Sequence, residues 1–230
     1  MSNTTSRARP RCYETAIADG YSFRLLIRRN GDFSGISDLF GTLLFGQQEV
    51  VGVFTGAIVH LAEPGEEPLA YAMDSHSSGL GDCYGELLME GKCLDEYAQL
   101  GDSDLLHLER LRILKPHRGR GLGNLVLASV LVLLCRSCEV AVLKPFPLQC
   151  SGALDPMASP EFRAKFERGR GKLVRCYSRI GFESAPKSEG WLFRYLESPE
   201  SILGRTRSQW NRSRTIRMPE IPEELEKLAN

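Results

Sequence analysis

The sequence predicts an α/β domain, and three observations lead to this fold class. Short segments rich in β-branched and aromatic residues recur along the chain and are typical of strands. One longer apolar segment, Leu125 to Leu134, contains no helix breaker and is typical of a buried helix. A glycine-rich turn, His117 to Gly123, joins that helix to the strand before it. The 230 residues, of which 42% are hydrophobic, suffice for one large domain with its own core.

Two strands and a short helix are expected in the first part of the chain. Tyr21 to Arg29 alternates partly between apolar and polar residues, as strands with one buried face do. Phe33 to Phe45 could hold a short helix. Val50 to Ala62 is a long strand, in which Gly52 and Gly56 indicate a bulge or a bend.

The segment after this strand contains the three residue types of a hydrolase catalytic triad. Tyr71 to Met89 could form a helix interrupted at residues 77–79 and at Gly81. Within it, positions 74–76 are Asp, Ser and His, the residue types of a hydrolase triad. Consecutive residues cannot adopt the geometry of a triad, so we assign them to helix capping and turns.

The centre of the chain is a strand, a glycine-rich turn and a helix. Leu105 to Leu114 has strand character and Pro116 ends it; the helix runs from Asn124 to about Cys135. The first N–H groups of a helix have no partner within it, and the helix dipole makes that end positive. Glycines also let a ligand approach the backbone closely. With two arginines in the turn, this unit is typical of a phosphate or pyrophosphate site.

Two common nucleotide-binding patterns do not fit this turn. The glycines at 119, 121 and 123 are evenly spaced, so the dinucleotide-binding fingerprint fails at Asn124. A P-loop requires Gly-Lys followed by Ser or Thr, whereas Gly171 and Lys172 are followed by Leu173.

Two short motifs fit a different family. Arg118, Gly121 and Gly123 form the pattern Arg-x-x-Gly-x-Gly between a strand and a helix. The segment from Cys176 to Phe182 has the form aromatic-Tyr-x-x-apolar-Gly-Phe, with a cysteine at the aromatic position. Together they resemble the GNAT superfamily of acyl-CoA N-acyltransferases, over about residues 105–196 and more weakly from residue 21.

Downstream of the central unit the sequence predicts further strands and helices. A strand is expected at Val140 to Leu143 and a closing one at Gly190 to Leu196. Residues 161–168 form a short amphipathic helix, and 173–180 a helix that ends at a left-handed glycine, Gly181. The basic segment between them, 168–172, is interpreted as a solvated loop, with a contact to cofactor phosphates as the alternative.

Charge, apolar run length and cysteine content argue against a nucleic-acid-binding, membrane-spanning or disulfide-bonded protein. Lysine plus arginine (29) equal aspartate plus glutamate (29), which argues against nucleic acid as the main partner. The longest apolar run is too short for a membrane span, which needs roughly 20 residues. The seven cysteines are odd in number and irregular in spacing, without an apolar leader, as in reduced cytoplasmic proteins. Cys135 and Cys138 lack a second pair of ligands, so no metal is expected.

Three regions are predicted. Residues 1–20 are expected to be a flexible N-terminal arm and residues 21–197 the acyltransferase domain. Residues 198–230 form an extension that is first arginine-rich and then acidic. Its arginines around Trp210 could bind the phosphate backbone of a nucleic acid. An extension that is solvated or packs on its own domain is the simpler interpretation.

The resemblance implies a fold and a cofactor. The fold would be GNAT-like, with a mixed, mostly antiparallel central sheet flanked by helices and splayed at the acyl-CoA cleft. The cofactor would be acetyl-CoA, held by backbone amides of the turn at its pyrophosphate and by two strand amides along its pantetheine arm. The turn residues are Arg118, Gly119, Arg120, Gly121, Leu122, Gly123 and Asn124, and the strand residues are Leu111 and Ile113.

The resemblance also implies a base and an acid. Glu109 falls where many family members carry a strand glutamate, and His107 is the reserve candidate for the base. Residues two apart in a strand share a face, so His107, Glu109, Leu111 and Ile113 should point the same way before any bulge. Apolar neighbours would make Glu109 a stronger base, although an ion pair with a nearby arginine is the alternative. Tyr177 matches the family's tyrosine near the thioester sulfur and would protonate the leaving thiolate.

The sequence therefore predicts an N-acetyltransferase that moves an acetyl group from acetyl-CoA to a primary amine by direct transfer in a ternary complex. A GNAT-fold module that binds acyl-CoA without chemistry is one alternative, and a protein that binds nucleic acid through its arginine tail is another. The acceptor amine and the oligomeric state are left open, with a homodimer as one alternative for the latter.

Overall fold

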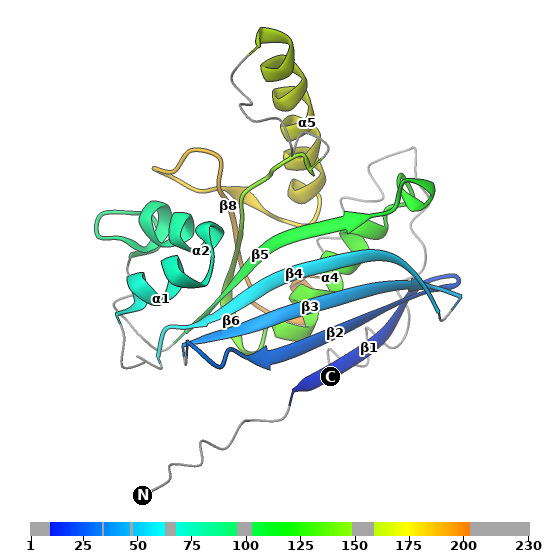
Figure 1. Ribbon diagram of the computed structural model, residues 1–230, viewed down its shortest axis with the longest axis horizontal. Helices are drawn as coiled ribbons and strands as arrows, with labels where there is room; N and C mark the ends of the chain where they lie inside the picture. The colour runs from blue at the N-terminus through cyan, green and yellow to red at the C-terminus, as the bar shows by residue number, and fades with distance from the viewer. Residues whose placement is uncertain are drawn as a thin grey trace, which may run out of the picture.

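The computed structural model describes residues 10–33, 35–46, 48–62, 68–95, 103–148 and 159–202. Within these ranges one sheet of eight strands has the order β1-β2-β3-β4-β5-β6-β8-β7 (Figure 1). The strands are β1 (Arg11–Ala18), β2 (Tyr21–Arg29), β3 (Ile36–Phe45), β4 (Glu49–His60), β5 (Asp104–Ile113), β6 (Cys138–Leu143), β7 (Glu183–Ser184) and β8 (Leu192–Tyr195).

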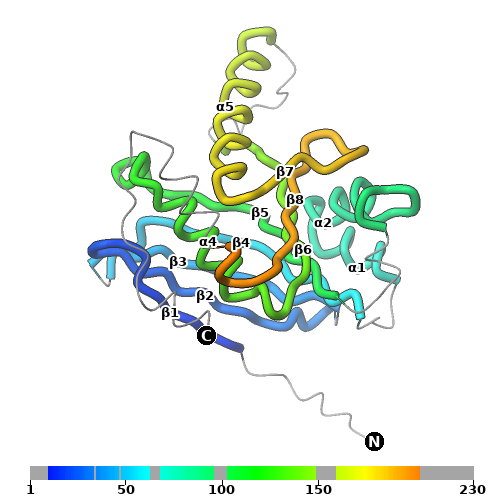
Figure 2. Tube along the Cα trace, turned by 180° about the vertical axis from the view of Figure 1, so that it is seen from behind, coloured from blue at the N-terminus to red at the C-terminus, as the bar shows by residue number. Residues whose placement is uncertain are grey.

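Helices cover both faces of this sheet. The helix α4 lies behind the sheet in Figure 1 and in front of it in Figure 2, whereas α1 and α2 cover one end of the opposite face. The helix α5 projects away from the sheet. The helical segments are α1 (Leu69–His76), α2 (Ser78–Cys83), the π-helical η1 (Tyr84–Leu88), the 3₁₀ turn η2 (Lys115–His117), α4 (Leu122–Leu134) and α5 (Pro160–Ser178).

The sheet is mixed and mostly antiparallel, as predicted. Among the strands of the described residues, only β5 and β6 pair in parallel. Their register covers Asp104 to His107 on β5 and Cys138 to Val142 on β6. Beyond His107 the ladder stops, and Figure 1 shows the two strands diverging. The expected splay is therefore present, and it begins at His107.

Two hydrophobic cores hold the layers together. The larger one lies between α4 and the sheet, where eleven of the thirteen residues of α4 are buried. The smaller one lies between the sheet and α1, α2 and η1, and its largest fully buried side chain is Trp191. Burial of apolar side chains at roughly 25 cal/mol per Å² makes both cores stabilising.

Three sequence-based expectations differ from the structure. Residues 11–18 of the predicted arm form β1, where buried Thr15 and Ile17 alternate with exposed neighbours. Residues 33–45 hold β3 rather than a helix, because an interior strand is apolar on both faces and resembles a buried helix in sequence. The basic segment 168–172 lies inside α5, so the two helices predicted there are one.

The helix α5 has strong start signals that explain its continuity. The hydroxyl of Ser159 accepts a hydrogen bond from the N–H of Phe162 at 3.1 Å, and Pro160 occupies the first turn. Two internal glycines each cost about 1 kcal/mol relative to alanine, which this helix tolerates.

The expectations for residues 1–9, for the arginine-rich and acidic segment from residue 203 onward, and for Trp210 lie outside the described residues. In the described part of the chain, no helix combines the length and the apolar character needed to cross a bilayer.

Candidate functional site

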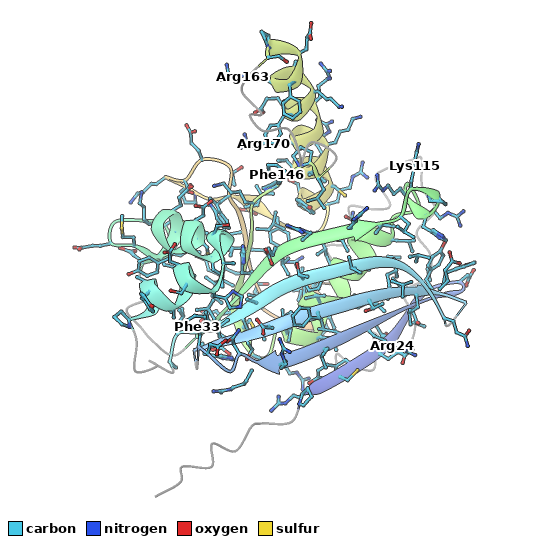
Figure 3. The ribbon with its side chains drawn as sticks, viewed as in Figure 1. Arg24, Phe33, Lys115, Phe146, Arg163 and Arg170 are labelled. Carbon is cyan, nitrogen blue, oxygen red and sulfur yellow. The ribbon has the colours of Figure 1, made fainter. Side chains whose placement is uncertain are left out.

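The glycine-rich turn lies at the far end of β5 from α1. In Figure 3, Lys115 marks this turn and Phe33 marks the opposite end of the sheet. Gly119 and Gly121 have φ values of 78° and 77°, in the left-handed region that favours glycine. Gly121 is the N-cap of α4, so the chain enters that helix directly from the turn.

The backbone N–H groups of this turn are available to a ligand. Asn124 N–H donates to the carbonyl of Gly121 at 3.0 Å, and the next residues continue the helix. Among the described residues, no backbone hydrogen bond uses the N–H groups of positions 119–123. These are the orphan donors of a helix start, and they lie at the positive end of its dipole.

The side chains of the turn mainly fix it to the sheet. The Nε of Arg118 donates to the carbonyl of Ile113 at 2.6 Å, and Arg120 donates to the hydroxyl of Tyr21 at 3.3 Å. The same hydroxyl lies 3.0 Å from Nδ1 of His117. The turn is therefore held by the ends of β2 and β5.

A buried contact joins the start of α4 to the end of α5. Asn124 is buried, and the thiol of Cys176 donates to its side-chain carbonyl at 2.9 Å. Burial raises the pKa of Cys176, which keeps the thiol protonated and able to donate. The cysteine at the aromatic position of the second motif thus contacts the residue that directly follows the first motif.

A bulge at Glu109 sets the faces of β5. Thr55 of β4 is paired with Arg110 and Gly56 with Leu108, so Glu109 is the extra residue. A Cβ on Gly56 would lie 2.5 Å from the carbonyl oxygen of His107, which explains the glycine opposite the bulge.

The bulge overturns the prediction that four side chains share one face. Leu111 and Ile113 pack against the core formed with α4. His107 lies on the other face, with its ring 5.8 Å from that of Trp191. An extra residue shifts the strand alternation by one, so His107 cannot face the same way as Leu111 and Ile113.

The amides of Leu111 and Ile113 point toward the diverging side of β5. The N–H of Leu114 donates to the carbonyl of Val51 in β4 at 2.8 Å. Backbone groups alternate along a strand, so the amides of Leu111 and Ile113 face away from β4, where the ladder to β6 has ended. The two predicted strand amides therefore lie on the splayed edge that leads to the turn.

Glu109 itself is exposed. Its carboxylate accepts a hydrogen bond from the hydroxyl of Thr55 at 3.3 Å. The apolar surroundings on which its assignment as a base depends are therefore absent, because the bulge turns it out of the core.

Tyr177 is half-buried at the end of α5. It packs against the core formed with α4, and its ring lies 6.4 Å from that of Phe182. Burial, and to a smaller extent Cys176, raises the pKa of Tyr177 to about 12, so the phenol is protonated at neutral pH. Gly181 has φ 87° and ends the helical segment, as predicted.

The sequence interpretation missed a second group of polar residues beside His107. His76 of α1, which was assigned to capping, places its Nε2 2.8 Å from the carboxylate of Asp38 on β3. Burial works to raise the pKa of Asp38, but hydrogen bonds from His76, Arg28 and Asn30 outweigh it and lower that pKa. No signal in the sequence links His76 to Asp38, because they lie far apart along the chain.

A serine, a histidine and an aspartate also meet, although not those at positions 74–76. The hydroxyl of Ser37 lies 2.8 Å from Nε2 of His60, and Nδ1 of His60 lies 2.8 Å from the carboxylate of Asp104. Ser37 is only 3% exposed on a strand paired on both sides, so the sheet uses its backbone N–H groups and none forms an oxyanion hole. We therefore assign this trio to stabilisation of the sheet.

The described residues contain no group of three or more His, Cys, Asp or Glu that could hold a metal ion. No protein-family model matches this chain, and no curated protein matches it in sequence.

Solved structures similar in fold include three acetyltransferase-related proteins. The AtaT toxin, as a mutant bound to the C-terminus of the antitoxin AtaR and acetyl-CoA, has 14% identity, covers 72% of each chain and gives a TM-score of 0.37. A putative arylalkylamine N-acetyltransferase of the yellow fever mosquito has 12% identity, with 69% of this chain and 64% of that chain covered and a TM-score of 0.36. NAA60 of Arabidopsis thaliana with acetyl-CoA has 13% identity, 68% and 73% coverage and a TM-score of 0.33. These scores are too low to add to what the strand order itself shows.

Proposed function

We propose that this protein is an acyl-CoA N-acyltransferase that moves an acetyl group from acetyl-CoA to a primary amine. The observation that carries the proposal is the row of unpaired N–H groups at 119–123 at the start of α4. Such a row binds phosphate oxygens well, because the donors and the helix dipole act on the same anion. The pyrophosphate of acetyl-CoA supplies that anion.

The splay of β5 and β6 supports the direction in which the cofactor runs. The turn follows β5 directly, and the strand edge from His107 to the turn is free of a ladder to β6. The amides of Leu111 and Ile113 on that edge can bind the amide groups of the pantetheine arm. The thioester would then lie near the point where the strands separate, and a strand amide there would stabilise the oxyanion that forms during attack.

Acetyl transfer requires that the acceptor ammonium lose a proton and that the departing thiolate gain one. Tyr177 is suited to the second step, because its phenol stays protonated at neutral pH. It also follows Cys176, which contacts Asn124 at the start of α4. Glu109 remains a candidate for the first step. Its exposure, however, favours a base that is better sheltered from water.

Calorimetric titration with acetyl-CoA, followed by a screen of primary amines, tests the proposal. We expect micromolar binding that Arg118→Glu weakens strongly, since it places a negative charge beside the pyrophosphate and removes the bond to Ile113. Arg118→Gln, which removes the positive charge without adding a negative one, should weaken binding less. A folded wild-type protein that does not bind acetyl-CoA would contradict the proposal.

A non-catalytic module that only binds acyl-CoA is the second candidate, since the turn would be the same. The two functions differ in the need for Tyr177. Binding of acetyl-CoA without acetyl transfer to any amine in the screen would favour the module.

A further inference from the structure

Two buried nitrogen atoms have no hydrogen-bond partner among the described residues, on the face of the sheet where Asp38 and His107 both pair with Ala57 of β4. They are Nε1 of Trp191 and Nδ1 of His76. Trp191 is only 1% exposed. Buried polar groups are nearly always hydrogen-bonded, so each exception calls for an explanation.

His107 lies in the same cluster. Its ring centroid is 5.8 Å from that of Trp191, and a Cβ on Gly79 would lie 3.4 Å from its Cε1. His107 is 4% exposed, and its side chain makes no hydrogen bond to a described residue. Burial, together with the charge of nearby His76, lowers the pKa of His107 to about 4. A neutral ring with a free lone pair therefore lies in this cluster at neutral pH.

His76 is oriented by a carboxylate on its other side. Asp38 contacts Nε2 of His76 at 2.8 Å and is itself held by Arg28 at 3.2 Å and Asn30 at 3.4 Å. In neutral His76 the proton then lies on Nε2, and the lone pair on the unpartnered Nδ1. An ionised carboxylate behind an imidazole stabilises the imidazolium that forms when the ring takes a proton.

The cluster lies where the proposed reaction would occur. His107 is the last residue of β5 that pairs with β6, through Val142. The thioester of a cofactor that runs along the splayed edge would end near this point. Phe33, which is labelled in Figure 3, places its ring 6.3 Å from that of His76.

We propose that His107, His76 and Asp38 form a proton relay that removes the proton of the acceptor ammonium. This inference rests on the proposed function, because it requires an amine at the splay. His107 is the residue that meets the amine. His76 and Asp38 are positioning residues that act through it. Among the described residues, the charged group that faces them is Arg28 and the titratable one is His107.

In the proposed reaction, one proton leaves the acceptor ammonium and another is taken up by the departing thiolate. The ammonium gives a proton to His107, and the amine lone pair attacks the thioester carbonyl. The C–N bond forms, the C–S bond breaks, and the thiolate takes a proton from a donor such as Tyr177. The proton on His107 passes to Nδ1 of His76, whose side chain is 17% exposed and can release it to solvent.

The relay can be tested by comparing two nucleophiles with acetyl-CoA. Phenethylamine is protonated at neutral pH and needs a base before it can attack, whereas hydroxylamine is largely unprotonated and does not. Removing a general base typically costs about 10²- to 10⁴-fold in rate. We expect His107→Gln and His76→Gln to slow transfer to phenethylamine by about 100-fold and to hydroxylamine by less than about tenfold.

Further variants separate a relay from a structural role. Asp38→Asn should slow acetyl transfer to phenethylamine less at high pH than at neutral pH. At high pH phenethylamine is already unprotonated, so it can attack the thioester without the relay. His60→Gln, a histidine variant in the trio on the other face of the sheet, should leave the ratio of the two rates unchanged. Acetyl-CoA binding and melting temperature identify variants that fail to fold.

The outcomes distinguish the two proposals. Equal losses for both nucleophiles, or no loss for either, would overturn the relay while acetyl transfer by the wild type still supports the proposed function. No transfer by the wild-type protein to either nucleophile would overturn the enzymatic function and the relay together.

Discussion

The two ends of β5 differ in whether their polar groups are hydrogen-bonded. At its start, Asp104 binds His60, which in turn binds Ser37, and every member of the trio has a partner. Past its end, the N–H groups of 119–123 have no partner within the described backbone. Paired polar groups stabilise the sheet, whereas unpaired ones retain their capacity to bind a ligand. The trio therefore contributes to the stability of the sheet, whereas the turn is the part that we propose binds a ligand.

The largest expected effect is on acetyl-CoA affinity, for a substitution in the glycine-rich turn. Gly121→Asp places a side chain at φ 77°, which is strained, and brings a negative charge to the helix start. We expect acetyl-CoA affinity to fall by about 100-fold or more, corresponding to about 3 kcal/mol. Gly31→Ala is the matched control, because its added Cβ meets nothing within 4 Å and its backbone is not left-handed. Calorimetric titration of both variants measures the difference, and equal affinities would contradict the assignment.

Acid should destabilise the protein through His107. Its pKa is about 4 in the folded protein against an ordinary 6.5, so the unfolded chain binds more protons between these values. Stability is therefore present above pH 6.5 and is lost as pH falls toward 4, by roughly 3 kcal/mol. Asp38, whose pKa is lowered, adds a loss only in more acidic solution. Denaturant unfolding from pH 7 to 4.5 should show the decline in wild type and a flatter curve in His107→Leu.

Tyr177→Phe should separate chemistry from binding. The phenol supplies a proton to the thiolate only during the reaction, and the ring still packs against the core formed with α4. We expect kcat to fall by about 10- to 100-fold with acetyl-CoA affinity nearly unchanged. Lost affinity or a lowered melting temperature would assign Tyr177 to packing alone.

His60→Ala should lower the stability of the protein without changing its affinity for acetyl-CoA. It removes two buried hydrogen bonds and leaves Ser37 and Asp104 without their partner. We expect a loss of about 1–3 kcal/mol in the free energy of unfolding and no change in acetyl-CoA affinity. A change in affinity beyond a few-fold would show that the two ends are coupled.

The smallest effect is expected for Glu109→Gln. The carboxylate is exposed and accepts one hydrogen bond from Thr55, so neither stability nor acetyl transfer should change more than about threefold. A loss of about 100-fold in the rate of transfer to phenethylamine would instead identify Glu109 as the base and contradict the relay.

The sequence predicted the proposed cofactor end of the molecule better than the proposed acceptor end. The strand, the turn and α4 are contiguous from 104 to 134, so local signals such as alternation and glycine spacing suffice to find them. The sequence indicated a bulge or bend at Gly56, and the register does shift between Thr55 and Gly56. It did not place the extra residue at Glu109, because that position depends on how β5 pairs with β4. The bulge decides which face His107 occupies.

The acceptor end is built from contacts between distant segments. His76 of α1 contacts Asp38 of β3, and His107 of β5 lies near Trp191, which directly precedes β8. Such pairs leave no trace in local periodicity. β3 was mistaken for a helix for a related reason, since burial on both faces removes the alternation that identifies a strand.

The measurement that tests the central assignment most directly compares two ligands by calorimetry. Acetyl-CoA carries the pyrophosphate, whereas S-acetyl-pantetheine carries the same thioester and arm without it. If the N–H groups of 119–123 bind the pyrophosphate, acetyl-CoA should bind at least about 100-fold more tightly, and Gly121→Asp should remove most of that difference. Equal affinity for the two ligands, or no binding of acetyl-CoA by the folded protein, would contradict the assignment of the turn.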